Sequence, residues 1–477
     1  MRKQSLRIIL ILILFILFYF KNIYNNNNEY NKTKNKYYQS SIEVENNNTE
    51  IVFLDKKVKI MVVSDLHYFP FEYTSETDEY KENVPNNRKL IKESEAINNE
   101  MKNRIIKSDV DLVFLTGDLT KDGERQSHLE FAKILNEIEN SGKKVFVVPG
   151  NHDINGSNAV KFEGENQIDV DTVSAEEFKK IYKNFGYDEA ISIDKNSISY
   201  MVEPVKGMKL IAIDSCIYGI NDEGMFSETG GSVDEIKLKW IKEQIKNIDP
   251  NKELILSIMH HNLIEHFENQ DKYFEGYVVE ESESIKNKFA DMGIRVVFTG
   301  HFHISDIAVN ITNKGNSIYD VETGSIITYP CPYRIIEIDK NIMNISTERI
   351  DYVDFYGINY DFQKYSYEFL LDGLGVLIHK MFKEYIKDKK LDTEDVDYLM
   401  NINITKDYTA EKIFTEAMME NYCGDEKISE NQKFVIDKLL NSDLKIYKLI
   451  GEITKSLFED NLPEDNTIKI YLDKVNE

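Results

Sequence analysis

The stretch VFVVPGNHD (Val145–Asp153) joins an apolar run directly to a group of polar residues, and it decides the fold. The four residues VFVV have the length and composition of a buried β-strand. Asn151, His152 and Asp153 close the stretch. An amide, an imidazole and a carboxylate delivered together at a strand end are ligands that divalent metals accept. The stretch therefore predicts a strand that carries part of a metal site at its end.

Four further segments share this arrangement, in which an apolar run ends in carboxylates or histidines. They are Asp65-Leu66-His67 after Val58–Val63, Gly117-Asp118 after Leu112–Thr116, Met259-His260-His261 after Leu254–Ile258, and Gly300-His301-Phe302-His303 after Val296–Phe298. Six of the 9 histidines of the chain lie in the five segments. Such a gathering of oxygen and nitrogen ligands fits a pair of divalent metals and indicates metal-assisted hydrolysis.

Strand patterns and amphipathic helix patterns alternate from Lys59 to about Asp339. Apolar residues at helical spacing predict helices over 88–107 and 124–140. This alternation is typical of crossover units that place helices on both faces of a sheet. Beyond about Asp354 the strand patterns disappear and a separate helical domain is expected. Its predicted helices are Glu368–Lys383, Ala410–Asn421, Asn431–Leu440 and Leu444–Phe458.

The N-terminal residues have the pattern of a membrane-targeting segment. Arg2, Lys3 and Arg7 precede an unbroken apolar run, Ile8–Phe20. Positive charge before the run predicts an N-in, C-out single-pass protein at the cell membrane, with the catalytic domain extracytoplasmic. We favour an uncleaved signal anchor. A cleaved signal peptide, which would give a secreted protein, is the alternative because the run also has the length of a signal-peptide core.

Charge and cysteine content exclude some classes of protein. The net charge of -25 argues against a nucleic-acid-binding surface, which needs clustered lysine and arginine, so no nucleic-acid polymer is expected as a partner. Cys216, Cys331 and Cys423 are odd in number and far apart. They predict neither a disulfide framework nor a thiolate metal cluster.

The order and wording of the five segments resemble the calcineurin-like metallophosphoesterase superfamily, whose signature runs D-x-H, GD, GNHD, H and GHxH. The motif Gly117-Asp118-Leu119-Thr120, with Gly123 following, resembles the corresponding motif of the class III cyclic-nucleotide phosphodiesterase branch of this superfamily. The resemblance covers roughly residues 58–340. It implies an α/β fold of two packed β-sheets flanked by helices, the metallophosphoesterase sandwich. The helical C-terminal domain resembles the one attached to some bacterial cyclic-nucleotide phosphodiesterase-like proteins.

These patterns and the resemblance together predict the organisation of the chain. We expect a signal anchor or signal peptide at 1–24, an Asn-rich tether at 25–50, a metallophosphoesterase domain at 51–353 and an all-α domain at 354–477.

The resemblance also assigns roles to individual residues. By motif position, one metal would be held by Asp65, His67, Asp118 and His303, and the second by Asp118, Asn151, His260 and His301. Nitrogen and oxygen ligands without thiolate suit Mn or Fe, with Zn as the alternative. In the family, the histidine at His152 protonates the leaving alkoxide, and the aspartate at Asp153 orients its ring.

Other candidates near these motifs have weaker assignments. His261 occupies the middle of the family's H-x-P, so it is a candidate to face the substrate or to support a ligand, and Asn262 replaces the usual proline. For His266 we expect a solvent-exposed loop position. Lys121 and Arg125 could meet phosphate, but surface exposure is the prediction for both.

The expected function is that of a dinuclear-metal phosphodiesterase. It would hydrolyse small phosphodiesters, with cyclic nucleotides among the candidates, by attack of a metal-bridging hydroxide. The alternatives are a phosphomonoesterase or a diesterase acting on envelope or glycerol phosphodiesters. A different class of function is a non-catalytic envelope scaffold whose C-terminal helices bind a partner protein. The sequence does not identify that partner.

Overall fold

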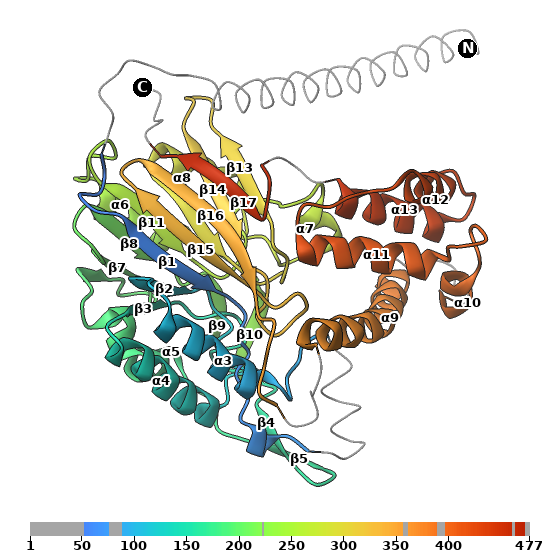
Figure 1. Ribbon diagram of the computed structural model, residues 1–477, viewed down its shortest axis with the longest axis horizontal. Helices are drawn as coiled ribbons and strands as arrows, with labels where there is room; N and C mark the ends of the chain where they lie inside the picture. The colour runs from blue at the N-terminus through green and yellow to red at the C-terminus, as the bar shows by residue number, and fades with distance from the viewer. Residues whose placement is uncertain are drawn as a thin grey trace, which may run out of the picture. The chain divides into compact units, whose positions relative to one another are not determined.

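The computed structural model describes residues 52–75, 88–221, 224–355, 361–388, 396–459 and 463–472 (Figure 1). These residues all belong to one compact unit, Ile51–Glu477. The predicted signal segment and the Asn-rich tether lie outside the described residues.

A six-stranded sheet in the order β17-β16-β15-β1-β2-β3 forms the first layer of the α/β part. Its strands β1, β2 and β3 are parallel, so their carboxyl ends lie at one edge. The bounds are β1 Val58–Val63, β2 Leu112–Leu115, β3 Lys144–Val147, β15 Pro332–Asp339, β16 Ile342–Arg349 and β17 Thr467–Tyr471.

A seven-stranded sheet in the order β13-β14-β12-β11-β8-β7-β6 forms the second layer. Strands β8, β11, β12 and β14 are parallel to one another. The bounds are β6 Ser192–Ile193, β7 Tyr200–Val202, β8 Met208–Ala212, β11 Leu254–Ile258, β12 Ile294–Thr299, β13 Ile307–Ile311 and β14 Ser317–Glu322. Two hairpins complete the strands: β4 Val160–Glu163 with β5 Asn166–Asp169, and β9 Cys216–Asn221 with β10 Gly224–Gly231.

The two sheets pack face to face through apolar side chains. Phe114 of β2 and Phe298 of β12 are fully buried, with ring centroids 5.9 Å apart. Both belong to one continuous apolar core that draws on both sheets. This packing fixes the carboxyl ends of the parallel strands of one sheet against those of the other, which is what a site built from both requires.

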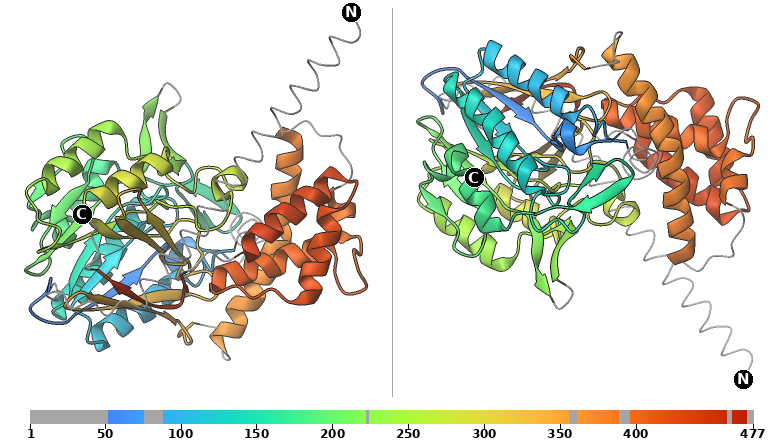
Figure 2. Two further views of the ribbon diagram at one scale, coloured as in Figure 1. Left: turned by 90° about the horizontal axis from the view of Figure 1, so that it is seen from above. Right: turned by 90° about the horizontal axis from the view of Figure 1, so that it is seen from below.

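Helices flank the sheets, as the helical spacing of apolar residues predicts (Figure 2). Helix α4 packs on β3 and on α3, while α8 packs on β12, β13 and β14. The bounds are α3 Ser94–Lys107, α4 Arg125–Asn140, α5 Ala175–Ile181, α6 Glu235–Ile245, α7 Gln270–Tyr273 and α8 Ser282–Asp291, with single turns at Phe71–Tyr73 and Lys183–Tyr187. The predicted α/β fold of two packed sheets flanked by helices is confirmed.

The C-terminal part is helical and has an apolar core of its own. Its helices are α9 Phe362–Asp388, α10 Val396–Asn401, α11 Ala410–Cys423, α12 Glu430–Leu440 and α13 Lys445–Phe458. Phe302 and Ile304 of the α/β part are members of this second core. After α13 the chain forms β17, which pairs antiparallel with β16. The all-α expectation missed this strand because five residues gain their stability from the neighbouring strand rather than from their own pattern.

The localisation prediction, a single-pass protein at the cell membrane, is not supported and is corrected here. Over residues 52–472, as far as the structure describes them, no helix is both long enough and apolar enough to cross a bilayer. Helix α9 has 27 residues, but charged residues recur along it. The run Ile8–Phe20, which carried the prediction, lies outside the described residues.

Candidate metal centre

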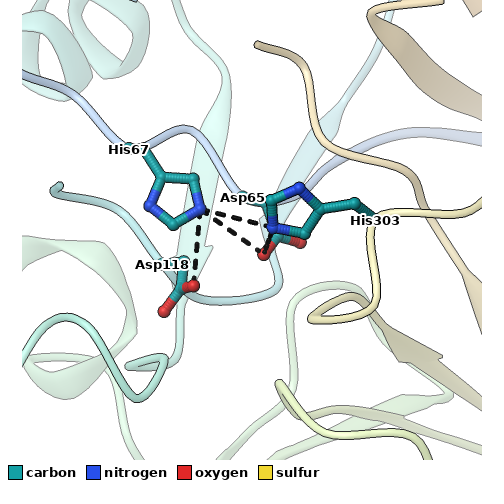
Figure 3. A group of neighbouring side chains, drawn as sticks. All are labelled: Asp65, His67, Asp118 and His303. Atoms are coloured by element: carbon teal, nitrogen blue, oxygen red, sulfur yellow. Dashed lines mark hydrogen bonds and ion pairs between the residues drawn. The ribbon is translucent and has the colours of Figure 1, made fainter. Parts of the chain in front are cut away.

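The five polar segments meet at the carboxyl ends of β1, β2, β3, β11 and β12. Two groups of buried side chains form there, each with ligand atoms within 4.8 Å of one another. The first cluster is Asp65, His67, Asp118 and His303, shown in Figure 3, and the second cluster is Asp118, His260 and His301. Asp118 is the member common to both.

In the first cluster, the ligand atoms of the four side chains face one another. The Nε2 atoms of His67 and His303 lie 3.4 Å apart, and Nε2 of His67 is 3.5 Å from Oδ2 of Asp118. Oδ2 of Asp65 accepts from the backbone N–H of His301 at 3.0 Å, which leaves Oδ1 turned toward His303 at 3.2 Å. This buried Oδ1 has no hydrogen-bond partner among the described residues. A buried carboxylate oxygen between imidazole nitrogens is a donor set that fits a divalent cation.

In the second cluster an amide completes the set. Nε2 of His260 lies 3.3 Å from Oδ1 of Asp118 and 3.1 Å from Oδ1 of Asn151. Nδ1 of His260 donates to the carbonyl of Thr116 at 2.9 Å, so that Nε2 is the nitrogen presented to the cluster. His301 contributes its ring from the segment after β12. The two clusters are therefore suited to a dinuclear metal site.

The backbone at the clusters is held in a conformation that L-residues rarely adopt. Asp65, His67, Asp118, His301 and His303 have φ of 51°, 39°, 49°, 80° and 75°. Each such residue costs of order 1–3 kcal/mol and persists only where the surrounding structure enforces it. The concentration of such strained residues in the two clusters indicates a functional site rather than one that serves stability.

Burial sets the protonation of the histidines in the first cluster. Burial lowers the pKa of His67 well below its usual value, and the charge of Lys89 acts in the same direction. Burial also lowers the pKa of His303 to about 4, although Asp65 opposes the change. At neutral pH these rings keep a free nitrogen lone pair, which is the form that binds a metal.

For Asp118 and His260, neighbouring charges outweigh burial and set the direction of the pKa shift. Burial acts against the ionisation of Asp118, but the charges of His260 and His152 hold its pKa well below the usual range. Burial likewise opposes the charge of His260, yet the carboxylate of Asp118 raises its pKa to about 9. A proton or a metal ion can thus occupy the space between these two side chains.

His152 lies at the rim of the clusters and is held by Asp122. Nδ1 of His152 is 2.7 Å from Oδ1 of Asp122, and its backbone N–H donates to Oδ1 of Asp118 at 3.0 Å. Its Nε2 lies 3.9 Å from Oδ2 of Asp118. Burial raises the pKa of Asp122, but Lys121 and His152 lower it to about 2, so this carboxylate stays ionised at neutral pH.

The orienting role that we expected for Asp153 is therefore corrected. Oδ2 of Asp153 accepts the backbone N–H groups of Gly150 at 2.8 Å and Leu119 at 3.0 Å, and Oδ1 accepts that of Thr120 at 2.9 Å. The fully buried Asp153 joins the turn after β2 to the turn after β3. The sequence reasoning missed Asp122, although it lies four residues after Asp118 and beside the quoted Gly123.

His261 is fully buried beside the second cluster. Its Nδ1 lies 2.8 Å from Oγ of Ser215 and its Nε2 lies 3.0 Å from the carbonyl of Thr229. Both ring nitrogens are thus engaged by the protein, and the ring packs 4.4 Å from that of His301. Of the two alternatives for His261, the geometry favours support of a ligand. The amide of Asn262 is also buried and donates to the carbonyl of Gly300 at 3.1 Å.

Two of the weaker sequence predictions were wrong. His266 is buried, and its Nδ1 lies 2.5 Å from Oδ1 of Asp306, so it is not an exposed loop residue. The Lys121 side chain is only 12% exposed and pairs with Asp122, whereas that of Arg125 is 47% exposed, as expected. Both errors share a cause, because single polar residues in loops give no signal for the partner that buries them.

Comparison with known proteins agrees with this fold and site. The sequence model described as calcineurin-like phosphoesterase matches residues 58–305, just over half of the chain. The chain therefore belongs to the calcineurin-like phosphoesterase family, within the metallophosphoesterase superfamily. A search of curated proteins gives no match.

The solved structures to which the chain is similar are distant in sequence. The chain is similar to a dimetal phosphatase from Danio rerio, at 12% identity and a TM-score of 0.44, over 63% of this chain and 97% of that one. It is also similar to purple acid phosphatase PPD1 from yellow lupin (Lupinus luteus) seeds, at 12% identity and a TM-score of 0.39, over 62% of this chain and 52% of that one. Such values support no conclusion about substrate.

Proposed function

We propose that the protein is a dinuclear-metal phosphodiesterase that hydrolyses small phosphodiesters. The family makes the protein a hydrolase of phosphate esters, and the finer assignment to diesters is our inference. The observation that carries it is the His152–Asp122 pair at 2.7 Å, at the rim of two clusters that share Asp118. The alkoxide that leaves an alkyl phosphate ester, whether diester or monoester, needs a proton, and in our proposal this pair supplies it.

The proposed ligands are the side chains already described. Asp65, His67, Asp118 and His303 would hold one divalent ion, and Asp118, Asn151, His260 and His301 the other. Mn or Fe suit this set of nitrogen and oxygen donors, and Zn is the alternative. Two such ions, when bound, activate water for attack and neutralise charge on the phosphoryl oxygens.

The protein groups then act on the proton and on the geometry. The ionised carboxylate of Asp122 accepts from Nδ1–H of His152, which fixes the ring with Nε2 turned toward Asp118. A proton on Nε2 can pass to the leaving oxygen of an ester bound over the clusters. The hydrogen bonds of Asp153 hold the turns that carry Asp118 and His152 in register.

Hydrolysis of two chromogenic esters tests the proposal. The full chain, purified with and without added Mn, is assayed with bis-p-nitrophenyl phosphate and with p-nitrophenyl phosphate. We expect metal-dependent cleavage of the diester that is lost in Asp118→Asn. His152→Ala should affect these esters less than an alkyl ester, because p-nitrophenolate leaves readily without a proton. Cleavage of the monoester alone would instead establish the phosphomonoesterase alternative. A folded, metal-loaded protein that cleaves neither ester would contradict both.

A further inference from the structure

Lys121 pairs with the carboxylate that holds His152 at the rim of the metal clusters. The Lys121 side chain is only 12% exposed, and its ammonium pairs with Oδ2 of Asp122. The other oxygen of the same carboxylate, Oδ1, lies 2.7 Å from Nδ1 of His152. The two oxygens of Asp122 are thus divided between a cation on one side and the proposed proton donor on the other.

The aromatic ring of Phe69 helps to fix where the ammonium of Lys121 lies. Nζ of Lys121 is 5.4 Å from the centroid of this ring, which is fully buried. That distance is within the range of a cation–π contact. The backbone N–H of Lys121 also donates to the carbonyl of Tyr68 at 3.3 Å. Both contacts attach Lys121 to the segment after β1 that bears His67, so its position is fixed relative to the first cluster.

Glu124 holds the backbone of the same turn. It is fully buried, and its Oε2 accepts from the backbone N–H of Asp122 at 3.1 Å and from Oγ of Ser127 at 3.3 Å. Its other oxygen, Oε1, lies 3.7 Å from Nζ of Lys121. Lys121 therefore holds the side chain of Asp122, while Glu124 holds the main chain and attracts the ammonium.

A carboxylate with a single partner would orient His152 poorly. The terminal torsion of an aspartate side chain is soft, so either oxygen can turn toward the imidazole. The His152 side chain is partly exposed, and water can therefore compete for the oxygen that the ring needs. A charge-assisted hydrogen bond is roughly twice as strong as a neutral one, so the ammonium on Oδ2 restricts this rotation.

We propose that Lys121 is a positioning residue for the transfer of a proton by His152. Its ammonium holds Oδ2 of Asp122, which keeps Oδ1 on Nδ1 of the ring and leaves Nε2 turned toward Asp118. This inference rests on the proposed function and adds to it a residue that acts through Asp122. The alternative raised by the sequence, that Lys121 meets phosphate, predicts a different kinetic effect, because loss of a phosphate contact raises KM.

Two esters that differ in leaving group test the proposal on the full, Mn-loaded chain. Methyl p-nitrobenzyl phosphate releases an alkoxide, which needs a proton, whereas methyl p-nitrophenyl phosphate releases a phenolate that leaves readily without one. Lys121→Met should lower kcat by about 10- to 100-fold on the benzyl ester and by much less on the phenyl ester, with KM unchanged. Lys121→Arg keeps the cation and should restore most of the activity. Lys102→Met is the matched control, since the Lys102 side chain is 15% exposed and pairs with Glu137 at 2.8 Å.

A double variant tests whether Lys121 acts through Asp122. If it does, adding Lys121→Met to Asp122→Asn should cost little further activity on the benzyl ester, because the group that Lys121 positions is already altered. Losses that multiply would show that the two residues act independently and would overturn the proposal. An equal loss on both esters, or a loss carried by KM, would overturn it as well.

Nuclear magnetic resonance of the full chain gives a readout that does not depend on turnover. In Zn-loaded protein with isotope-labelled histidine, the Nδ1–H proton of His152 should be protected from exchange by its hydrogen bond to Asp122, and His152→Gln identifies its signal. The signal should persist in Lys121→Arg and in Lys102→Met, and it should be lost in Lys121→Met.

Thermal unfolding shows whether each variant is folded, and Lys121→Gln serves as the neutral variant if Lys121→Met is not. A protected proton that is absent from the wild type, or that survives unchanged in the folded neutral variant, would overturn the inference. Failure of the wild type to cleave either ester, with the proton signals as expected, would count against the proposed function only.

Discussion

Two buried groups of histidines and carboxylates occupy neighbouring segments of this protein, and they differ in what balances their charge. In the His266 cluster, composed of His266, Asp306, Asp320 and Glu322, the ring lies 2.5 Å from Asp306, 3.5 Å from Asp320 and 3.8 Å from Glu322. Burial opposes its charge, but Asp306 and Asp320 raise the pKa of His266 well above the usual value. An imidazolium thus supplies positive charge to Asp306 and Asp320, whereas burial raises the pKa of Glu322 well above its usual value.

The first metal cluster has the same residue types but the opposite protonation. There the pKa values of His67 and His303 are lowered, so the rings are neutral, and Oδ1 of Asp65 is buried with no hydrogen bond from any residue that the structure describes. In the His266 cluster, by contrast, Oδ2 of Asp320 accepts from the backbone N–H groups of Leu263 and Ile264. The comparison teaches that residue type alone does not make a metal site. In the first metal cluster, the low pKa of the histidine rings leaves donor nitrogens open to a metal.

The largest expected effect comes from the residue that joins the two metal clusters. Asp118→Asn should lower hydrolysis of a phosphate ester by at least about 100- to 1000-fold, because a neutral amide neither bridges nor balances two cations. Steady-state assays and metal analysis by mass spectrometry would measure the loss. Asp109→Asn, an exposed carboxylate before β2 whose side chain is 77% exposed, is the matched control. Full activity in Asp118→Asn would contradict the assignment of Asp118 as the ligand shared by the two metal clusters.

One substitution in each cluster separates stability from metal binding. His266→Gln should lower the free energy of unfolding by about 3–5 kcal/mol, because it leaves buried carboxylates without their cation, yet it should keep two metals per chain. His303→Gln should instead weaken metal binding by at least about 10- to 100-fold. Urea unfolding and metal analysis would be measured on both variants. Loss of metal from a folded His266→Gln protein would show that the His266 cluster belongs to the site.

A third pair of imidazole and carboxylate, His152 with Asp122, is only partly buried, since the His152 side chain is 31% exposed. Asp122→Asn should lower kcat by about 10- to 100-fold through misorientation of His152, with metal content unchanged. Asp153→Asn is the contrasting variant, and it should lower stability because Asp153 accepts three backbone N–H groups. If kcat fell only in Asp153→Asn, the orienting role would return to Asp153.

The smallest effect is a difference in pH dependence between the clusters. Because the folded-state pKa of His266 is raised, its stabilisation is fully present below about pH 6.5 and is lost as pH rises through the folded-state pKa. The penalty of His266→Gln should therefore shrink at alkaline pH. The pKa of His303 is lowered to about 4, so in metal-free protein its cost to stability grows as pH falls from about 6.5 toward 4. Urea unfolding at pH 5, 6.5 and 9 would check both signs, and a penalty that grows with pH for His266→Gln would contradict the assignment.

Much of the site could be predicted from sequence because its ligands follow buried strands in short, ordered motifs. Asp65, His67 and Asp118 come directly after β1 and β2, and parallel strands bring such ends to one edge. The role of Asp122 could not be predicted with the same certainty, because either it or Asp153 can reach His152 and only the turn geometry separates them. The burial of His266 could likewise not be predicted from the sequence, since its partner Asp306 is forty residues away.

By itself the sequence determined the alternation of strands and helices, the identity of the metal-ligand residues and the helical nature of most of the C-terminal part, because these depend on local period and on short motifs. The tertiary structure alone decided the protonation of the histidines, whose pKa values are lowered for His67 and His303 and raised for His260 and His266. It also brought Tyr422 to Arg88, and β17 to β16. The physical reason is that protonation, ion pairing and strand pairing depend on neighbours distant in the chain, whose approach no local pattern encodes.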